Sequence, residues 1–142
     1  MSCMIFIVED HPAILEAYRR LIRREPDLRI CGEAESGEET LRKLATLAPT
    51  LLLMDLLLPG LNGSELIRQI RRRYPALPIL VVSGQDDRAS ITRALEAGAG
   101  GYLHKFDCAR HLGNAIRQVA RGIPFVDGRL RAAHPIRRPL VH

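Results

Sequence analysis

Five short apolar segments, spaced about 25 residues apart, constrain the fold of this 142-residue chain more than any other feature of its sequence. Three are clear, at residues 3–8, 51–54 and 79–82, and two weaker ones lie at 28–33 and 101–105. Each is too short for a helix and is followed by a polar or turn residue, as is typical of strands buried on both faces. The spacing leaves room for one strand and one crossover helix per unit, which favours a parallel sheet over hairpins.

The segments between these strands have helical periodicity, with apolar residues recurring on one face of each predicted helix. Ser36 followed by Glu39 is a capping-box pattern that predicts a helix start. Gly98 and Gly122 suit the C-terminal ends of helices. Five strands alternating with five helices predict an α/β protein, a (βα)5 three-layer sandwich.

The net charge of +5 suggests a nucleic-acid partner, but the excess lies at the C-terminus. Residues 1–127 carry 17 basic and 16 acidic side chains, whereas the segment after Asp127 has four arginines and no acidic residue. Such a segment could touch phosphates only weakly and without reading bases, so DNA binding by this chain alone is not expected. We therefore divide the chain into a folded domain, 1–126, and a basic tail or truncated linker, 127–142.

Cysteine content and hydropathy point to a soluble, cytoplasmic protein. The three cysteines are odd in number and have neither CxxC nor metal-ligand spacing, which favours reduced, packed thiols. No apolar run approaches the roughly 18 residues of a membrane helix, and no basic segment precedes the first apolar run.

Polar residues follow four of the predicted strands, at the strand ends where open parallel sheets bind ligands. Glu9 and Asp10 follow the first strand, Asp55 the third, Ser83 the fourth and Lys105 the fifth. Because the carboxyl ends of parallel strands lie at one edge of the sheet, we expect these side chains to converge there.

Asp55 is the most informative of them, because it interrupts the leucine-rich run 51–58, where an unpaired carboxylate is costly to desolvate. A cation should therefore face it. Lys105 is one candidate and a divalent metal the other, with Glu9 and Asp10 supplying further oxygen ligands of the kind that Mg²⁺ prefers. The alternative is that Asp55 caps a turn near the surface.

This combination resembles the receiver domain of two-component response regulators, over residues 4 to about 126. It consists of the acid pair, Asp55 followed by Pro59–Gly63, Ser83 and Lys105, in order and on the βα rhythm. The segments most similar to the NarL/FixJ subfamily are Asp10-His11-Pro12, Gly98–Leu103 and Ala115–Gly122. The resemblance implies a flavodoxin-like fold with a five-stranded parallel sheet in the order 2-1-3-4-5.

The resemblance also implies a chemical role for each strand end. Asp55 would accept a phosphoryl group from a phosphohistidine on a sensor histidine kinase or phosphotransfer protein. Mg²⁺ would be held by Asp10, Asp55 and the backbone carbonyl of Leu57, with Glu9 helping through water. Lys105 would pair with a phosphoryl oxygen.

A switch is implied as well. The Ser83 hydroxyl would donate to another phosphoryl oxygen, and its movement would let Tyr102 turn inward, changing the face formed by the fourth helix, fifth strand and fifth helix. The ordinary alternatives are a strand-end lysine in water at 105, a turn residue at Ser83 and core packing by Tyr102. His11 is assigned no chemistry.

Three residues depart from the usual receiver pattern. Phe106 stands where many receivers have proline, His104 replaces a usually apolar residue, and Gln85 lies at a variable position. The first of these leaves the backbone geometry after Lys105 open. None of them removes a phosphorylation residue.

Enzyme functions fit the same strand ends less well. Glu9, Asp10 and His11 would repel the phosphate of a mononucleotide, and neither a Walker loop nor GxGxxG is present. A phosphatase with an aspartyl nucleophile usually has a second Asp two residues on, where this chain has Leu57. We expect a phosphoacceptor signalling protein, with at most self-catalysed phosphorylation and dephosphorylation.

Two functions follow from the resemblance. The chain is a stand-alone phosphorylation-dependent interaction module, or it is the receiver part of a DNA-binding transcription regulator, for whose helix-turn-helix domain this chain has no room. A homodimer through the switch face, or through the first and fifth helices, is compatible with either function. No membrane partner is expected.

Overall fold

The five predicted βα units are present, in order, in the computed structural model. The structure describes residues 2–58 and 61–128, so Pro59, Gly60 and residues 129–142 of the basic tail lie outside the described residues. The strands of the main sheet are β1 (Cys3–Val8), β2 (Leu28–Ala34), β3 (Leu51–Met54), β6 (Ile79–Ser83), β7 (Gly101–His104) and β8 (Phe125–Val126). The helices are α1 (Pro12–Arg23), α2 (Gly37–Leu44), α3 (Gly63–Arg73), α4 (Arg88–Ala97) and α5 (Cys108–Ala120). A small antiparallel pair, β4 (Leu57–Leu58) and β5 (Leu61–Asn62), precedes α3, and a 3-10 turn, η1 (Lys105–Asp107), precedes α5.

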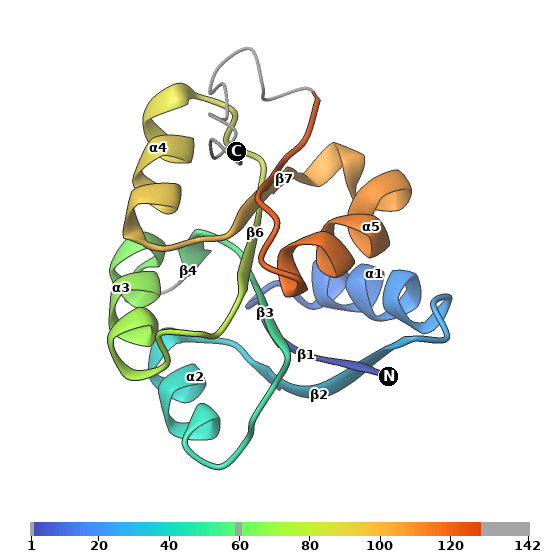
Figure 1. The fold of residues 1–142 in the computed structure, drawn as a ribbon, viewed down its shortest axis with the longest axis horizontal. Helices are drawn as coiled ribbons and strands as arrows, with labels where there is room; N and C mark the ends of the chain where they lie inside the picture. The colour runs from blue at the N-terminus through green and yellow to red at the C-terminus, as the bar shows by residue number, and fades with distance from the viewer. Residues whose placement is uncertain (1, 59–60, 129–142) are drawn as a thin grey trace, which may run out of the picture.

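The main sheet is parallel, with the strand order β2-β1-β3-β6-β7-β8 (Figure 1). Its first five strands are the five predicted ones, in the predicted order 2-1-3-4-5. The sheet differs from the prediction by a sixth strand, β8, which pairs with β7 after α5. Because β8 has only two residues, it is too short to show a periodic pattern in the sequence.

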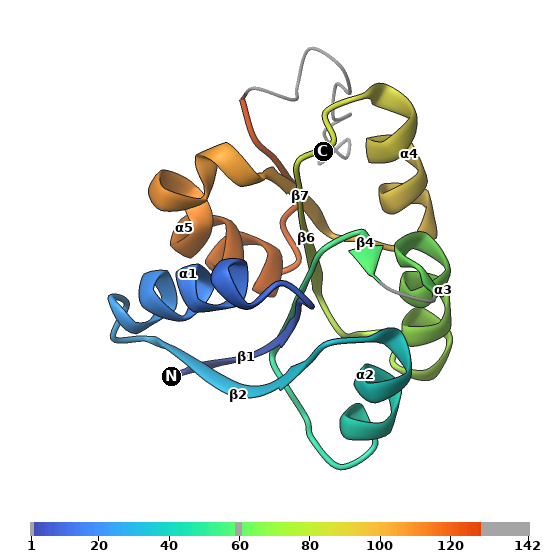
Figure 2. The ribbon, with the colours of Figure 1, turned by 180° about the vertical axis from the view of Figure 1, so that it is seen from behind.

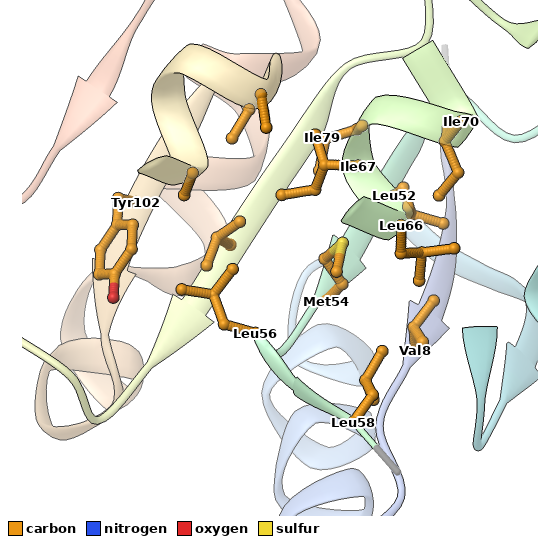
Figure 3. Close-up of a cluster of buried hydrophobic side chains, with 14 of the residues drawn as sticks. Val8, Leu52, Met54, Leu56, Leu58, Leu66, Ile67, Ile70, Ile79 and Tyr102 are labelled. Atoms are coloured by element: carbon orange, nitrogen blue, oxygen red, sulfur yellow. The ribbon is translucent and has the colours of Figure 1, made fainter. Parts of the chain in front are cut away.

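Helices cover both faces of the sheet, which confirms the three-layer sandwich (Figures 1 and 2). Alternate residues of β1 show why: Ile5 and Ile7 pack with α1 and α5, whereas Phe6 and Val8 pack with α3 and α4. Figure 3 shows part of the second of these clusters. Burial on both faces explains why the strands are continuous apolar runs rather than alternating ones.

The helix ends follow the expected chemistry. The Ser36 hydroxyl accepts a hydrogen bond from the Glu39 N–H (3.1 Å), as the capping-box pattern predicts. Asn62 and Asp87 cap α3 and α4 in the same way. Gly98 ends α4 at φ 123°, a backbone conformation that side chains with a Cβ rarely adopt. None of the helices within residues 2–58 and 61–128 has both the length and the apolar character that a membrane span requires.

The fold extends past the predicted boundary at residue 126. Asp127, which the sequence analysis places in the tail, is 2% exposed. Its N–H donates to the Tyr102 carbonyl (3.3 Å), and its side-chain Oδ2 accepts from the His104 N–H (2.6 Å). The structural domain therefore includes at least Asp127.

Arg71 joins the ends of α3 and α4. Its guanidinium donates to the carbonyls of Pro75 (2.9 Å), Leu77 (2.7 Å) and Gly98 (2.7 Å). Burial lowers the pKa of this guanidinium, so its bonds form in a partly desolvated place. The sequence does not distinguish Arg71 from its neighbour Arg72, whose side chain is 72% exposed.

We expect Arg71→Ala to lower the free energy of unfolding by about 2–3 kcal/mol, because several partly buried carbonyls lose a charged donor. The matched change Arg72→Ala should cost about 0.5 kcal/mol or less, as surface substitutions usually do. Urea unfolding of the two variants measures both values. Equal losses would contradict a structural role for Arg71.

Candidate functional site

Asp55 and Lys105 form an ion pair at the carboxyl edge of the sheet. Lys105 Nζ lies 2.8 Å from Asp55 Oδ2. The Asp55 side chain is 4% exposed and that of Lys105 29% exposed, so water reaches the pair mainly from the lysine side. Lys105 is therefore the cation that the buried carboxylate requires.

The backbone after β3 holds Asp55 in place. The Asp55 N–H donates to the Val8 carbonyl (3.3 Å), which ties the end of β3 to the end of β1. Asp55 Oδ1 accepts from the Leu57 N–H (3.1 Å), so both carboxylate oxygens have a partner. The loop then returns closely on itself at Gly63, where an added Cβ would lie 2.4 Å from the Leu56 carbonyl oxygen. Only glycine fits there.

Glu9 lies beside Asp55 and is 1% exposed. Its Oε2 accepts from the N–H groups of Asp10 (3.0 Å) and His11 (3.2 Å), whereas its buried Oε1 has no hydrogen-bond partner among the residues that the structure describes. Desolvation raises the pKa of Glu9 to about 7, and the negative charge of Asp55 adds to this effect. The bond from the His11 N–H and the charge of Lys105 lower this pKa and offset only part of the rise.

The donor types at this edge fit Mg²⁺. The charges of Glu9, Asp55 and Lys105 act on one another, and Asp10 follows Glu9 in the chain. Among the described residues, the buried Glu9 Oε1 is unpartnered, and carboxylate oxygens are ligands that Mg²⁺ prefers. A divalent cation would balance this excess of negative charge. Within residues 2–58 and 61–128, however, no three His, Cys, Asp or Glu side chains are grouped closely enough to hold a metal. Asp55 faces Lys105 instead, so a metal site here requires these side chains to reorient.

Ser83 and Tyr102 meet through Gln85. Ser83, fully buried at the end of β6, accepts from the Gln85 N–H through its hydroxyl (3.1 Å). The Tyr102 hydroxyl donates to the Gln85 carbonyl (2.8 Å), and its ring lies among buried side chains (Figure 3). Burial raises the pKa of Tyr102 to about 12, and the Ser83 hydroxyl opposes this. Tyr102 thus already points inward in this structure.

Two residues near the site have roles that the sequence analysis does not assign. The buried His104 accepts from the Phe106 N–H through Nδ1 (3.1 Å), which caps the turn η1 that carries Lys105. Asp127 accepts from the His104 N–H. Both residues leave a signal in the sequence. His104 departs from the receiver pattern, and Asp127 is an acidic residue directly after the apolar pair Phe125-Val126. Phe106 itself is 80% exposed.

Comparison with known proteins gives one consistent result. A family model described as the response regulator receiver domain matches residues 5–117. The transcriptional regulatory protein DegU of Brevibacillus brevis is 34% identical over 122 residues, which cover 86% of this chain and 52% of DegU. The response regulator GacA of Pseudomonas protegens is 34% identical over 86% of this chain and 57% of GacA. The chain therefore spans about half the length of the curated relatives it matches.

Solved structures agree. A two-component response regulator of the LuxR family from Aurantimonas has a TM-score of 0.89 and 34% identity, over 94% of this chain and 95% of that one. The isolated receiver domain of RcsB from Salmonella enterica, solved with the phosphomimetic BeF3−, shares the fold, with a TM-score of 0.87 at 24% identity over 94% of this chain and 99% of that one.

The raised pKa of Glu9 predicts a pH-dependent stability. The folded state holds the Glu9 proton more tightly than the unfolded state does. The contribution of protonated Glu9 to the free energy of unfolding is therefore complete below pH 4.5 and is lost as the pH rises through about 7. We expect Glu9→Gln, which stays neutral, to be more stable than the wild type by about 2 kcal/mol at about pH 8, and not at about pH 4.

Urea unfolding of both proteins at the two pH values measures this difference. Adding Mg²⁺ at the higher pH should stabilise the wild type and so reduce the difference in the free energy of unfolding between the two proteins. A wild type and variant of equal stability at the higher pH would contradict the prediction.

Proposed function

This chain belongs to the response regulator receiver family, and we propose that Asp55 accepts a phosphoryl group from a phosphohistidine of a sensor histidine kinase or phosphotransfer protein. The observation that carries the proposal is the Asp55–Lys105 pair, a buried carboxylate held 2.8 Å from the lysine ammonium at the carboxyl edge of the sheet. Family membership makes the chain a receiver, a signalling domain of two-component systems.

The proposed transfer step uses this pair. An Asp55 oxygen forms the new bond to phosphorus while the P–N bond to the donor histidine breaks, and the bonding electron pair returns to the imidazole of the donor. The product is an acyl phosphate on Asp55. Lys105 then exchanges a carboxylate oxygen for a phosphoryl oxygen and stabilises the added charge, as preorganised cations do in phosphoryl transfer.

We propose that Asp10, Asp55 and the backbone carbonyl of Leu57 hold Mg²⁺, with Glu9 acting through water. When bound, the cation neutralises charge on the transferring phosphoryl group. The unpartnered Glu9 Oε1 and the surplus of carboxylates support this assignment.

We propose that Ser83 donates to a phosphoryl oxygen and thereby signals to Tyr102. Both residues already share Gln85, since the Ser83 hydroxyl binds its N–H and the Tyr102 hydroxyl its carbonyl. A shift of Ser83 toward Asp55 would pull on this loop, which leads into α4. The face formed by α4, β7 and α5 would then differ between the two states.

The relatives support a second proposal, that this receiver works within a cytoplasmic DNA-binding transcription regulator. DegU is named a transcriptional regulatory protein, and the matched region of this chain covers only 52% of DegU and 57% of GacA. RcsB, whose fold this chain shares, has been solved as dimers bound to DNA. A dimer of this chain would use the α4-β7-α5 face or helices α1 and α5. The alternative is a stand-alone module that switches a protein partner.

Incubation with acetyl phosphate and Mg²⁺ should add one phosphoryl group to the wild type, and none to Asp55→Asn, because the amide is a poor nucleophile. Intact mass spectrometry measures both. An unchanged wild-type mass would count against the proposed function.

Lys105→Ala should reduce the phosphorylation-dependent change in the amide NMR signals of α4 and β7 far more than Lys43→Ala does. Lys43 is the matched control, because it binds the Glu33 carbonyl and the Glu39 carboxylate on α2 rather than Asp55. Equal effects of the two substitutions would remove Lys105 from the switch.

A further inference from the structure

We propose that Asp127 is a positioning residue for Lys105, and that its hydrogen bond with the His104 N–H couples the phosphorylation site to β8 and Gly128. The proposal rests on the proposed roles of Asp55 and Lys105. It assigns a function to a residue that follows the last helix and lies far from the site in the sequence.

The strand β8 brings Asp127 to the edge of the sheet next to the site. After α5, the chain pairs in parallel with β7, with Phe125 opposite Gly101 and Val126 opposite Tyr102 (Figure 1, red). The Phe125 N–H donates to the Gly100 carbonyl (3.3 Å), and the Asp127 N–H donates to the Tyr102 carbonyl (3.3 Å). This register places the Asp127 side chain beside the last residue of β7.

The Asp127 carboxylate then accepts from the β7 backbone, as the carbonyl of a further strand residue would. Its Oδ2 accepts from the His104 N–H at 2.6 Å. Asp127 is 2% exposed, and His104 is 3% exposed. A buried carboxylate at a sheet edge is costly unless it is bound, so this contact constrains both residues strongly.

His104 passes the constraint on to Lys105. Its N–H is held by Asp127, and its Nδ1 accepts from the Phe106 N–H (3.1 Å). The Cys108 thiol lies 3.9 Å from the His104 carbonyl and donates to it. Lys105 therefore lies between His104 and Phe106, whose backbone N–H groups are both hydrogen-bonded. From this constrained backbone its ammonium reaches Asp55.

Electrostatics indicate that Asp127 and Lys105 share one environment. Burial raises the pKa of the Cys108 thiol to about 12, and the charge of Asp107 adds to the effect. The charge of Lys105 lowers this pKa, and that of Asp127 raises it. Both charges thus act on the same buried thiol at the start of α5.

The arrangement links two events. A phosphoryl group on Asp55 would separate Asp55 from Lys105 and re-aim the lysine, which moves the backbone at His104. Because Asp127 binds that backbone, β8 and Gly128 would respond. Coupling of this kind is reciprocal, so removing the Asp127 carboxylate must also change how the site takes up phosphate.

The test compares three variants of the full chain: Asp127→Ala, Asp127→Asn and Val126→Ala. The first removes the acceptor, and the second keeps an acceptor oxygen of the same shape without the charge. The third is the matched control for lost packing, because Val126 is 1% exposed and packs in the core. Val126→Ala keeps the Asp127 carboxylate in the sequence. Stability is measured for each, so that a general loss of packing can be separated from positioning.

We expect Asp127→Ala to slow phosphorylation by acetyl phosphate about tenfold, with Asp127→Asn intermediate, because a charge-assisted bond is lost or weakened. The His104 amide proton should shift upfield in Asp127→Ala and stay in place in Val126→Ala. In the wild type, phosphorylation should shift the amide signals of Asp127 and Gly128, and in Asp127→Ala the shift at Gly128 should be lost.

Two results would overturn the proposal. One is an Asp127→Ala variant that is phosphorylated at the wild-type rate. The other is a Val126→Ala variant of equal stability that slows phosphorylation as much as Asp127→Ala does, which would reduce Asp127 to a packing role.

Failure of the proposed function is recognised separately. If the wild type takes up no phosphoryl group, the role of Asp55 fails. The positioning of Lys105 is then judged from the His104 amide and Lys105 side-chain signals, which must shift together in Asp127→Ala and not in Val126→Ala for the proposal to stand.

Discussion

An ionised carboxylate at the end of a buried strand requires a cation, and the rest of the site depends on how this chain supplies one. Asp55 follows β3 and Lys105 follows β7, and β6 lies between those strands in the sheet. The lysine therefore reaches across the end of β6, where Ser83 lies. This ion pair joins the ends of β3 and β7 across the end of β6.

Two connections lead away from that point. One runs from Ser83 through Gln85 to Tyr102, and Gln85 lies just before Asp87, the residue that caps α4. The other runs from Lys105 through His104 to Asp127. Both include hydrogen bonds of buried side chains, those of Ser83 and Tyr102 in the first and those of His104 and Asp127 in the second, which are costly to leave unmade. In the proposed switch, a change at Asp55 reaches α4 through the first connection and β8 through the second.

Much of the fold could be predicted from the sequence, because the apolar runs and the helical periodicity are local patterns. The chemical types at the strand ends also stand out locally, and Asp55 within a leucine-rich run is the clearest case. Resemblance to receivers supplied the sheet order, which periodicity alone leaves open. Strand β8 could not be predicted, since two residues form a strand only where a partner edge is available. For the same reason, Asp127 looked like the first residue of a tail.

The sequence by itself determined the order of the βα units and the kinds of groups that meet at the carboxyl edge of the sheet. Only the tertiary structure decided which of those groups touch: that Lys105 faces Asp55, that Glu9 keeps an unpartnered oxygen, and that Tyr102 points inward. It also decided that a carboxylate 23 residues beyond His104 binds its backbone. The reason is that spacing along a chain specifies composition at an edge, whereas distances of about 3 Å depend on register, burial and hydrogen-bond geometry among residues far apart in sequence.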